Sequence, residues 1–308
     1  MKPCKAAWGY GLIVLTYLIV LFWGDSQKGF FEFLPTALMQ LPVLMSLALI
    51  SFGLRYARWF YLLRLAGSQV PVWQGWLAYL SGFAFTATPG KVGELVRIRY
   101  FGRLQVESSL VMSAFVFERA LDLLVVFCLA ALWVVDNQMF IVASTFVGVF
   151  LLFVSFLMYR SKSLEVLGMA FIGNGWSRIG QFLCFFANAM ANCAVWLKPI
   201  PLLLSLFLGF GAWCTTAITF VYLLITLQLH LPLLAAFAAY PLALLAGAAS
   251  MMPGGLGTTE TAIVIQLQTH GVPVSTALLV AVAVRLGTMW FSVFLGFTSI
   301  FILSKWKN

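Results

Sequence analysis

The chain has 308 residues, of which 63% are hydrophobic and only 9% are charged, and its mean hydropathy is +1.02. A chain this apolar does not stay soluble as a globular domain, so the sequence predicts an integral membrane protein. The formal net charge of +9 does not indicate a nucleic-acid partner, because the basic residues lie in short clusters beside apolar segments, where anionic lipid headgroups attract them.

Six apolar segments are near or above the ~20 residues that cross a bilayer as a helix. In chain order they are 8–23, 36–54, 108–135, 139–158, 200–227 and 274–303. None has the weak alternation of a membrane β-barrel strand. The first follows Lys2 and Lys5 as a signal peptide does, but the residues after Trp23 offer no small-residue cleavage site, so we expect a retained anchor. The sequence therefore predicts an all-α integral membrane protein with about six transmembrane helices.

Two further apolar segments, 72–88 and 233–252, each lead into a Pro-Gly motif. If both enter the membrane and turn back, about fifteen Lys and Arg residues lie on the cytoplasmic side and one, Lys28, lies outside. If both cross, the count becomes roughly seven against nine. The positive-inside rule therefore favours two re-entrant helical hairpins, with both termini in the cytoplasm. Arg55, Arg58 and Arg97 are among the residues that this count places in the cytoplasm.

A short motif occurs twice in the chain. ThrProGlyLysValGlyGlu at 88–94 returns, lengthened by two residues, as MetProGlyGlyLeuGlyThrThrGlu at 252–260. An Arg inside an apolar segment follows the Glu of each motif by 25 residues. These pairs are Glu94 with Arg119 and Glu260 with Arg285. Matched intramembrane charges in two related segments predict one central site built from two halves.

In the predicted topology the two motifs face opposite sides of the membrane, so the halves form an inverted repeat. Inverted repeats with interrupted helices around a site at the membrane midplane are an architecture of transporters. We expect a single membrane domain over 1–308. Its parts are a first repeat at 36–135, a connecting helix and interfacial linker at 136–199, and an inverted second repeat at 200–303. The linker itself is expected at 164–197, where charged and amide residues mix with apolar ones.

Charged side chains within the 108–135 segment define the candidate binding site. Glu118, Arg119 and Asp122 lie about ten to fourteen residues into this helix, near the bilayer centre at 1.5 Å per residue. Their spacing predicts that Glu118 and Asp122 share one helix face, with Arg119 adjacent. In one interpretation, Arg119 and Arg285 only neutralise carboxylates and fix helix packing. In the other, they bind the phosphate of a lipid headgroup, because the guanidinium fork binds phosphate bidentately and keeps its charge when desolvated.

The Pro-Gly motifs are predicted to gate this site. Pro ends one half-helix, the glycines permit a tight turn, and the next helix begins with free N–H groups that attract anions. An ordinary loop between helices is the alternative. The predicted gating residues are Pro89, Gly90, Gly93, Pro253, Gly254, Gly255 and Gly257. A bulky side chain at Gly93 or Gly257 is expected to block transport, because only hydrogen is expected to fit there. Glu94 and Glu260 begin the next helices, where they cap the helix, hold the arginines when no lipid is bound, or accept a headgroup amine.

Motifs of common enzymes and metal sites are absent from the sequence. There is no HExxH, GxSxG or Walker motif, and no Ser or Cys stands near a His. The five cysteines form no CxxC pair. We therefore expect no catalytic residues, no metal, no cofactor and no disulfide, and any transport is passive, ion-coupled or driven by synthesis on one side.

Five segments together resemble the lysylphosphatidylglycerol synthase transmembrane family, also called flippase-like membrane proteins. They are ThrProGlyLysValGlyGluLeuValArg at 88–97, PheGluArgAlaLeuAspLeuLeu at 117–124, TyrProLeuAlaLeuLeuAlaGly at 240–247, MetProGlyGlyLeuGlyThrThrGluThrAla at 252–262 and ValArgLeuGly at 284–287. The resemblance runs from about 36 to 303 and implies a bacterial or archaeal inner-membrane protein. The chain resembles the membrane region of relatives that are fused to a synthase domain and that move an aminoacylated phosphatidylglycerol from the inner to the outer leaflet. The sequence does not include their soluble aminoacyl-transferase domain, so the resemblance implies no synthase activity.

The residues and the resemblance together predict a flippase of the cytoplasmic membrane. Its substrate is expected to be an anionic or phosphate-bearing lipid, either a phospholipid or a polyprenyl-linked lipid. Two alternatives stay open, a membrane-embedded lipid-modifying enzyme and a non-transporting partner that presents lipid to a separate synthase. The sequence assigns neither the particular lipid nor the oligomeric state.

Overall fold

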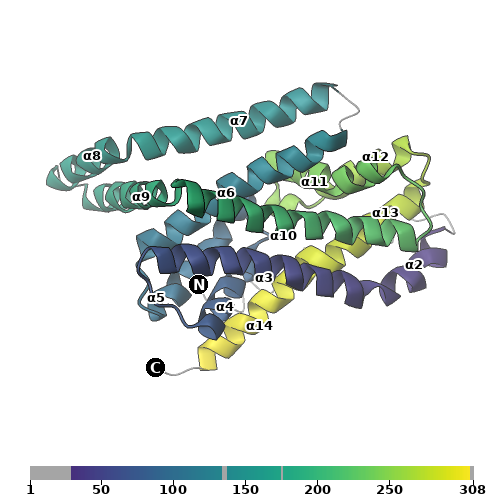
Figure 1. The fold of residues 1–308 in the computed structure, drawn as a ribbon, viewed down its shortest axis with the longest axis horizontal. Coiled ribbons are helices and arrows are strands. Elements are labelled where there is room, and N and C mark those ends of the chain that lie inside the picture. Colours follow the sequence, from purple (N-terminus) through teal and green to yellow (C-terminus); the bar gives the residue numbers. More distant parts are fainter. Residues whose placement is uncertain (1–28, 134–136, 175, 306–308) are drawn as a thin grey trace.

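The computed structural model describes residues 29–133, 137–174 and 176–305. Every regular element in these ranges is a helix, and the long helices run side by side in Figure 1. The predicted all-helical architecture is therefore confirmed for the described chain. The predicted anchor at 8–23 lies outside the described residues.

Long helices form the body of the protein. They are α3 (Leu41–Leu65), α6 (Ser108–Ala130), α7 (Asn137–Tyr159), α9 (Ser177–Trp196), α10 (Pro199–Thr226), and α13 (Val274–Arg285), which continues through the π-helix η5 (Leu286–Trp290) into α14 (Phe291–Lys305). In the described ranges, α3, α9, α10 and the continuous Val274–Lys305 helix are long and apolar enough to cross a membrane. Part of α7 and the next helix, bent by 65°, would be a fifth span. The count of six spans thus stays a prediction.

Shorter helices connect these long ones. They are α2 (Gly29–Met39), α4 (Val72–Ser81), η1 (Gly82–Phe85), η2 (Pro89–Val96), α5 (Arg97–Arg103), η3 (Ala131–Trp133), α8 (Ser161–Gly173), α11 (Leu233–Ala249), η4 (Pro253–Gly255) and α12 (Thr258–Thr269). We call α4 to α5 the first hairpin and α11 to α12 the second hairpin. In Figure 1 the first hairpin lies toward one end of the long helices and the second toward the other.

The two halves of the chain pack against each other reciprocally. Helices α3 and α10 lie along one another. The first hairpin packs through α4 and η1 on α14, the last helix of the second half, and the second hairpin packs through α11 on α6, the last long helix of the first half. The tips, η2 and η4, touch. Each half therefore inserts its hairpin against the other half.

One close contact shows how tightly the first hairpin is held. Gly296 of α14 faces the backbone of Ala84 in η1, where a Cβ on the glycine would overlap the Ala84 nitrogen. Only a residue without a side chain permits this approach of two backbones.

The first long helix differs from its prediction at both ends. It was expected at 36–54, but the helix is interrupted by a turn at Gln40, and α3 then begins at Leu41 and continues to Leu65. Arg55 and Arg58 are 8% and 0% exposed, and Arg97 on α5 is 1% exposed. Their side of the membrane stays a prediction, but within the protein they are buried and not exposed to water. They are buried because carboxylates on α6 and η2 neutralise them, which the charge count ignores.

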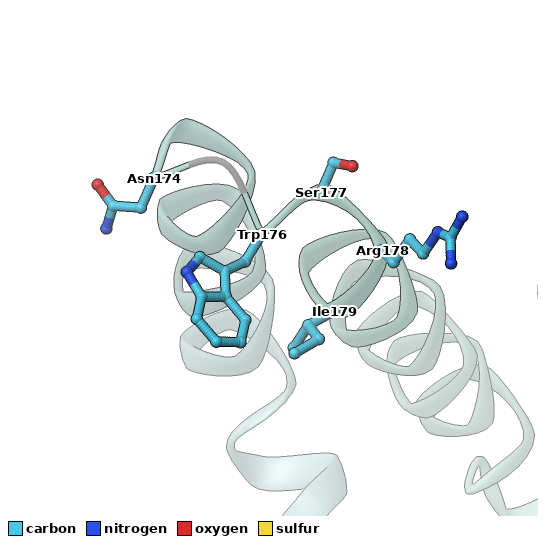
Figure 2. A pocket seen from close by; sticks show the side chains of 5 residues that line it. All are labelled: Asn174, Trp176, Ser177, Arg178 and Ile179. Carbon is cyan, nitrogen blue, oxygen red and sulfur yellow. The ribbon is translucent and has the colours of Figure 1, made fainter.

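The segment expected to be an interfacial linker, 164–197, forms an antiparallel pair of helices, α8 and α9. Gly168 and Gly180 let them pack closely, since a Cβ on Gly168 would lie 2.7 Å from Cys184 Sγ. Figure 2 shows the turn between them, from which Asn174 and Arg178 point away in opposite directions. Because α9 is long and apolar enough to span, the interfacial location stays a prediction.

The topology can be tested by labelling single cysteines in a cysteine-free variant. In Figure 1, α5 and α8 lie at one end of the long helices, while α7 begins and α10 ends at the other. An impermeant reagent added outside the cell is expected to label positions near Asn137 and His230 and to miss positions near Arg99 and Lys162. Labelling of Arg99 from outside would contradict the re-entrant first hairpin.

Candidate functional site

A network of buried ion pairs joins the first hairpin to α3 and α6. We call it the charge cluster, and it consists of Arg55, Arg58, Glu94, Arg97, Glu118, Arg119 and Asp122. The most accessible side chain of the cluster, Arg119, is 15% exposed. Ions this deeply buried need close partners, because removing a charge from water costs several kcal/mol in a real protein.

Glu118 lies at the centre of the charge cluster. Its Oε1 accepts hydrogen bonds from Arg58 Nη2 at 3.0 Å and from the Tyr79 hydroxyl at 3.1 Å. Its Oε2 lies 2.8 Å from Arg119 Nη2 and 3.6 Å from Arg97 Nη1. One carboxylate therefore holds three guanidinium groups that come from three different helices.

Asp122 lies one helical turn after Glu118, so both carboxylates point from the same face of α6. It accepts hydrogen bonds from Arg55 Nη1 at 2.9 Å and Arg58 Nη2 at 2.8 Å. The shared face predicted for the two carboxylates is confirmed. Gly209 on α10 leaves room for this arrangement, because a Cβ there would lie 2.7 Å from Arg58 Nη1.

Arg97 occupies an aromatic pocket at the start of α5. Its guanidinium carbon is 4.1 Å from the ring centre of Tyr79, with Trp59 and Phe83 also in cation–π range. Its Nε donates a hydrogen bond to the Tyr79 carbonyl at 2.7 Å. Gly82 provides the space, since a Cβ on this residue would overlap the Arg97 side chain. The side chain is thus fixed with its Nη groups toward Glu94 and Glu118.

Glu94 is buried in η2, close to two arginines. It accepts a hydrogen bond from Thr86 Oγ1 at 3.1 Å, and its Oε2 lies 3.2 Å from Arg97 Nη1 and 3.9 Å from Arg119 Nη2. The expectation that Glu94 begins a helix is wrong, because η2 already starts at Pro89. Lys91, half-buried in η2, interacts electrostatically with both Arg119 and Glu94.

The second half holds a simpler ion pair. Arg285 Nε lies 2.8 Å from Glu260 Oε1, and Arg285 Nη2 donates a hydrogen bond to the Gly254 carbonyl at 2.7 Å. Glu260 stands in the first turn of α12, as the sequence predicted. Arg285 therefore ties the end of α13 to the tip of the second hairpin.

The two hairpin tips meet between these sites. Gly254 has a φ of +62°, and a Cβ on it would lie 3.2 Å from the Ala87 Cα. Ala87 follows Thr86, which donates to Glu94 of the charge cluster. Within the described ranges, no ion pair connects the charge cluster to Arg285. The structure thus gathers Glu94, Glu118, Arg119 and Asp122 in one group and Glu260 with Arg285 in another.

Arg55, Arg58 and Arg97 belong to the site but were not predicted there. Arg55 and Arg58 are three residues apart, a spacing that places two side chains on one helix face. This spacing, directly after an apolar run, was the available signal. Arg97 carried no comparable signal, because its partners lie on the hairpin tip and on a distant helix.

A model of the lysylphosphatidylglycerol synthase TM region family matches residues 8–296 of the chain. The chain belongs to this family. No curated protein and no solved structure matches it. Family membership and the apolar helices together show a multi-pass membrane protein with a role connected to membrane lipids.

The glycines of the two Pro-Gly motifs differ in their backbone conformation and in the space around them. Gly93 donates its N–H to Thr88 Oγ1 at 2.7 Å, and a Cβ on it would lie 2.6 Å from the Phe85 carbonyl oxygen. Gly255 has a φ of +64° and is equally crowded, with Thr259 Oγ1 2.6 Å from a Cβ position. Gly257 has a φ of +81° but no atom within 4 Å of a Cβ position.

These differences correct one expectation and give a prediction. Bulk was expected to be excluded at both Gly93 and Gly257, but only Gly93 is crowded. Gly93→Leu should displace the first hairpin and block function, whereas Gly257→Leu carries a backbone strain of about 1–3 kcal/mol but no crowding, because Gly257 borders an apolar groove with Met252 and Leu256. Lipid transfer and thermal stability measure both effects.

Gly53→Leu is the matched control, because a Cβ at Gly53 of α3 also meets nothing within 4 Å. It should keep wild-type transfer. Equal loss of function in the Gly93 and Gly257 variants would contradict the distinction between crowding and strain.

Proposed function

We propose that the protein is a flippase of the cytoplasmic membrane that moves an anionic or phosphate-bearing lipid, a phospholipid or a polyprenyl-linked lipid, between leaflets. The observation that carries this proposal is the charge cluster beside the meeting point of two helical hairpins. Buried guanidinium groups suit a phosphate, which has to lose its water on the way through the hydrocarbon. The proposed activity needs no cofactor and no catalytic residue.

The proposal includes an inverted repeat with two re-entrant hairpins. Each half runs through a long helix, a hairpin and a second long helix, and each hairpin packs on the last long helix of the other half. The hairpins lie toward opposite ends of the long helices, as two inverted halves require (Figure 1). Their irregular tips contact each other, and such backbone is tolerated at membrane depth where protein covers it or where it lines a cavity.

In this mechanism, Arg119 and Arg285 provide the guanidinium groups that receive the headgroup phosphate. Their carboxylate partners, among them Glu118 and Glu260, neutralise them when no lipid is bound. The touching tips, with Gly254 against Ala87, close the path, and their separation opens it toward one leaflet at a time.

Reconstitution of the purified protein into vesicles tests the proposal. A fluorescent phosphatidylglycerol is the probe, and a membrane-impermeant reductant quenches the exposed leaflet. Transfer faster than in protein-free vesicles supports a flippase. Chemical change of the lipid would support the lipid-modifying enzyme instead. If the protein neither transfers nor changes the lipid, the lipid-presenting partner is supported. Arg119→Gln should slow transfer, while Arg99→Gln, at an exposed position of α5, should not.

A further inference from the structure

The charge cluster contains more positive than negative groups. Four guanidinium groups face three carboxylates, which leaves one positive charge, and the ammonium of Lys91, which interacts electrostatically with Arg119 and Glu94, makes two. In the described part of the chain, no other Asp or Glu forms an ion pair with this cluster. The second site differs, because Arg285 and Glu260 balance one to one. An uncompensated buried charge is unfavourable, so an anion is expected to bind in the first half.

All four arginines of the cluster also have N–H groups without acceptors. Among the residues that the structure describes, the buried nitrogens that donate no hydrogen bond are Arg55 Nε, Arg58 Nε and Nη1, Arg97 Nη1 and Nη2, and Arg119 Nε. Buried donors without acceptors are rare and call for an explanation. Arg58 Nη1 lies against Gly209 of α10, whereas Arg97 Nη1 lies 3.2 Å from Glu94 of η2. The Nη groups of Arg97 are therefore the unsatisfied donors that an anion at the hairpin tip would meet.

Glu94 is the carboxylate held least firmly there. Its Oε2 lies 3.2 Å from Arg97 and 3.9 Å from Arg119, whereas Glu118 approaches Arg119 to 2.8 Å. It also belongs to the hairpin tip, while Glu118 and Asp122 belong to a long helix. A competing anion would displace Glu94 before either of the other two.

We propose that a phosphate group binds between Lys91, Arg97 and Arg119 and displaces the Glu94 carboxylate from the two arginines. This inference rests on the proposed function for its lipid source and assigns binding to the first half. A phosphodiester carries one negative charge, which matches the guanidinium excess. A phosphomonoester carries about −1.5 to −2, which matches the excess with Lys91 included. Because Glu94 belongs to η2, its release also loosens the first hairpin from α6.

Thermal unfolding of the full chain in a neutral detergent tests this binding. The probes are a short-chain phosphatidylglycerol, the diacylglycerol of the same chain length, and glycerol phosphate. Phosphatidylglycerol should raise Tm and diacylglycerol should not, because only the former carries the phosphate. If glycerol phosphate acts like the lipid, the site takes free phosphate compounds as well; if it has no effect, the source is the headgroup. Equal stabilisation by phosphatidylglycerol and diacylglycerol would overturn the proposal.

Variants of the site give a sharper test. Glu94→Gln removes the competing carboxylate and should tighten phosphatidylglycerol binding about tenfold, whereas Arg97→Gln should weaken it tenfold or more. Arg99→Gln is the matched control, because Arg99 lies two residues away on α5 and is exposed. If Arg97→Gln does not fold, Lys91→Gln, at a half-buried position, should still weaken binding. A purely structural Glu94 would lower Tm without tightening binding, and that outcome would refute the proposal.

Transfer in vesicles, measured on the same variants, separates this inference from the proposed function. If phosphatidylglycerol affinity changes in the variants as expected but no variant and no wild-type protein transfers lipid, the flippase is rejected and the phosphate site is kept. If the wild-type protein transfers lipid but the Glu94→Gln and Lys91→Gln variants bind phosphatidylglycerol with wild-type affinity, the flippase is kept and the phosphate site is rejected.

Discussion

Glu118→Gln is expected to lower the stability of the protein more than any other single conservative change. The carboxylate is fully buried and lies against Arg58, Arg97 and Arg119, so its loss leaves three guanidinium groups with fewer anions. Breaking a buried ion pair costs about 3–5 kcal/mol, and a cluster with excess positive charge has no substitute anion. The measurement is Tm in detergent together with the yield of folded protein.

Glu165→Gln provides the control, because Glu165 is exposed on α8. It should leave Tm unchanged. The paired change of Glu118 and Arg119 to Gln is not neutral either, because Arg58 and Arg97 keep their charges and lose the same carboxylate. Wild-type Tm in Glu118→Gln would contradict the arrangement of the charge cluster.

Arg285→Met is expected to have the second largest effect, and its combination with Glu260→Gln separates packing from function. The single change leaves the buried Glu260 without its guanidinium and should cost about 3–5 kcal/mol. The paired change replaces both ions, so most of this loss should be recovered, except for about 1 kcal/mol from the bond to the Gly254 carbonyl.

Transport by the paired variant then decides the role of the pair. If Arg285 receives the headgroup, the stable paired variant should transfer lipid about tenfold to a hundredfold more slowly, the loss of one charge-assisted contact. Arg285→Lys should also transfer lipid slowly, because an ammonium group does not make the separate bonds to Glu260 and Gly254 that the guanidinium makes. Full activity in a stable paired variant would leave only the packing role.

Long apolar segments were the most predictable part of the fold. Helix α10 was expected at 200–227 and is observed at Pro199–Thr226, and α6 begins at Ser108 as expected. These boundaries are set locally, by polar or Pro-containing sequence at each end of an apolar run. The π-helix at Leu286–Trp290 and the 3₁₀ helix over Pro89–Val96 were not predicted, because they depend on tertiary contacts.

The candidate site was predictable only where its charged residues lie within apolar segments. Glu118, Arg119, Asp122 and Arg285 stand out because each lies within an apolar run, where a charge is unusual. Arg58 lies near the end of a run, and its partner Asp122 is 64 positions further along the chain. Rules based on neighbouring sequence assign such a residue to a loop, and only the packing of α3 against α6 reveals its burial.

The most direct test is the initial rate at which purified protein moves a fluorescent lipid between vesicle leaflets. Two probes with the same acyl chains are compared, a phosphatidylglycerol and a ceramide or diacylglycerol that carries no phosphate. A flippase with a buried arginine site for the headgroup should accelerate phosphatidylglycerol over protein-free vesicles and should leave the phosphate-free probe at its own protein-free rate, because that probe has no charge to carry through the hydrocarbon. A phosphatidylglycerol rate equal to that of protein-free vesicles would contradict the flippase, and equal acceleration of both probes would contradict the headgroup site.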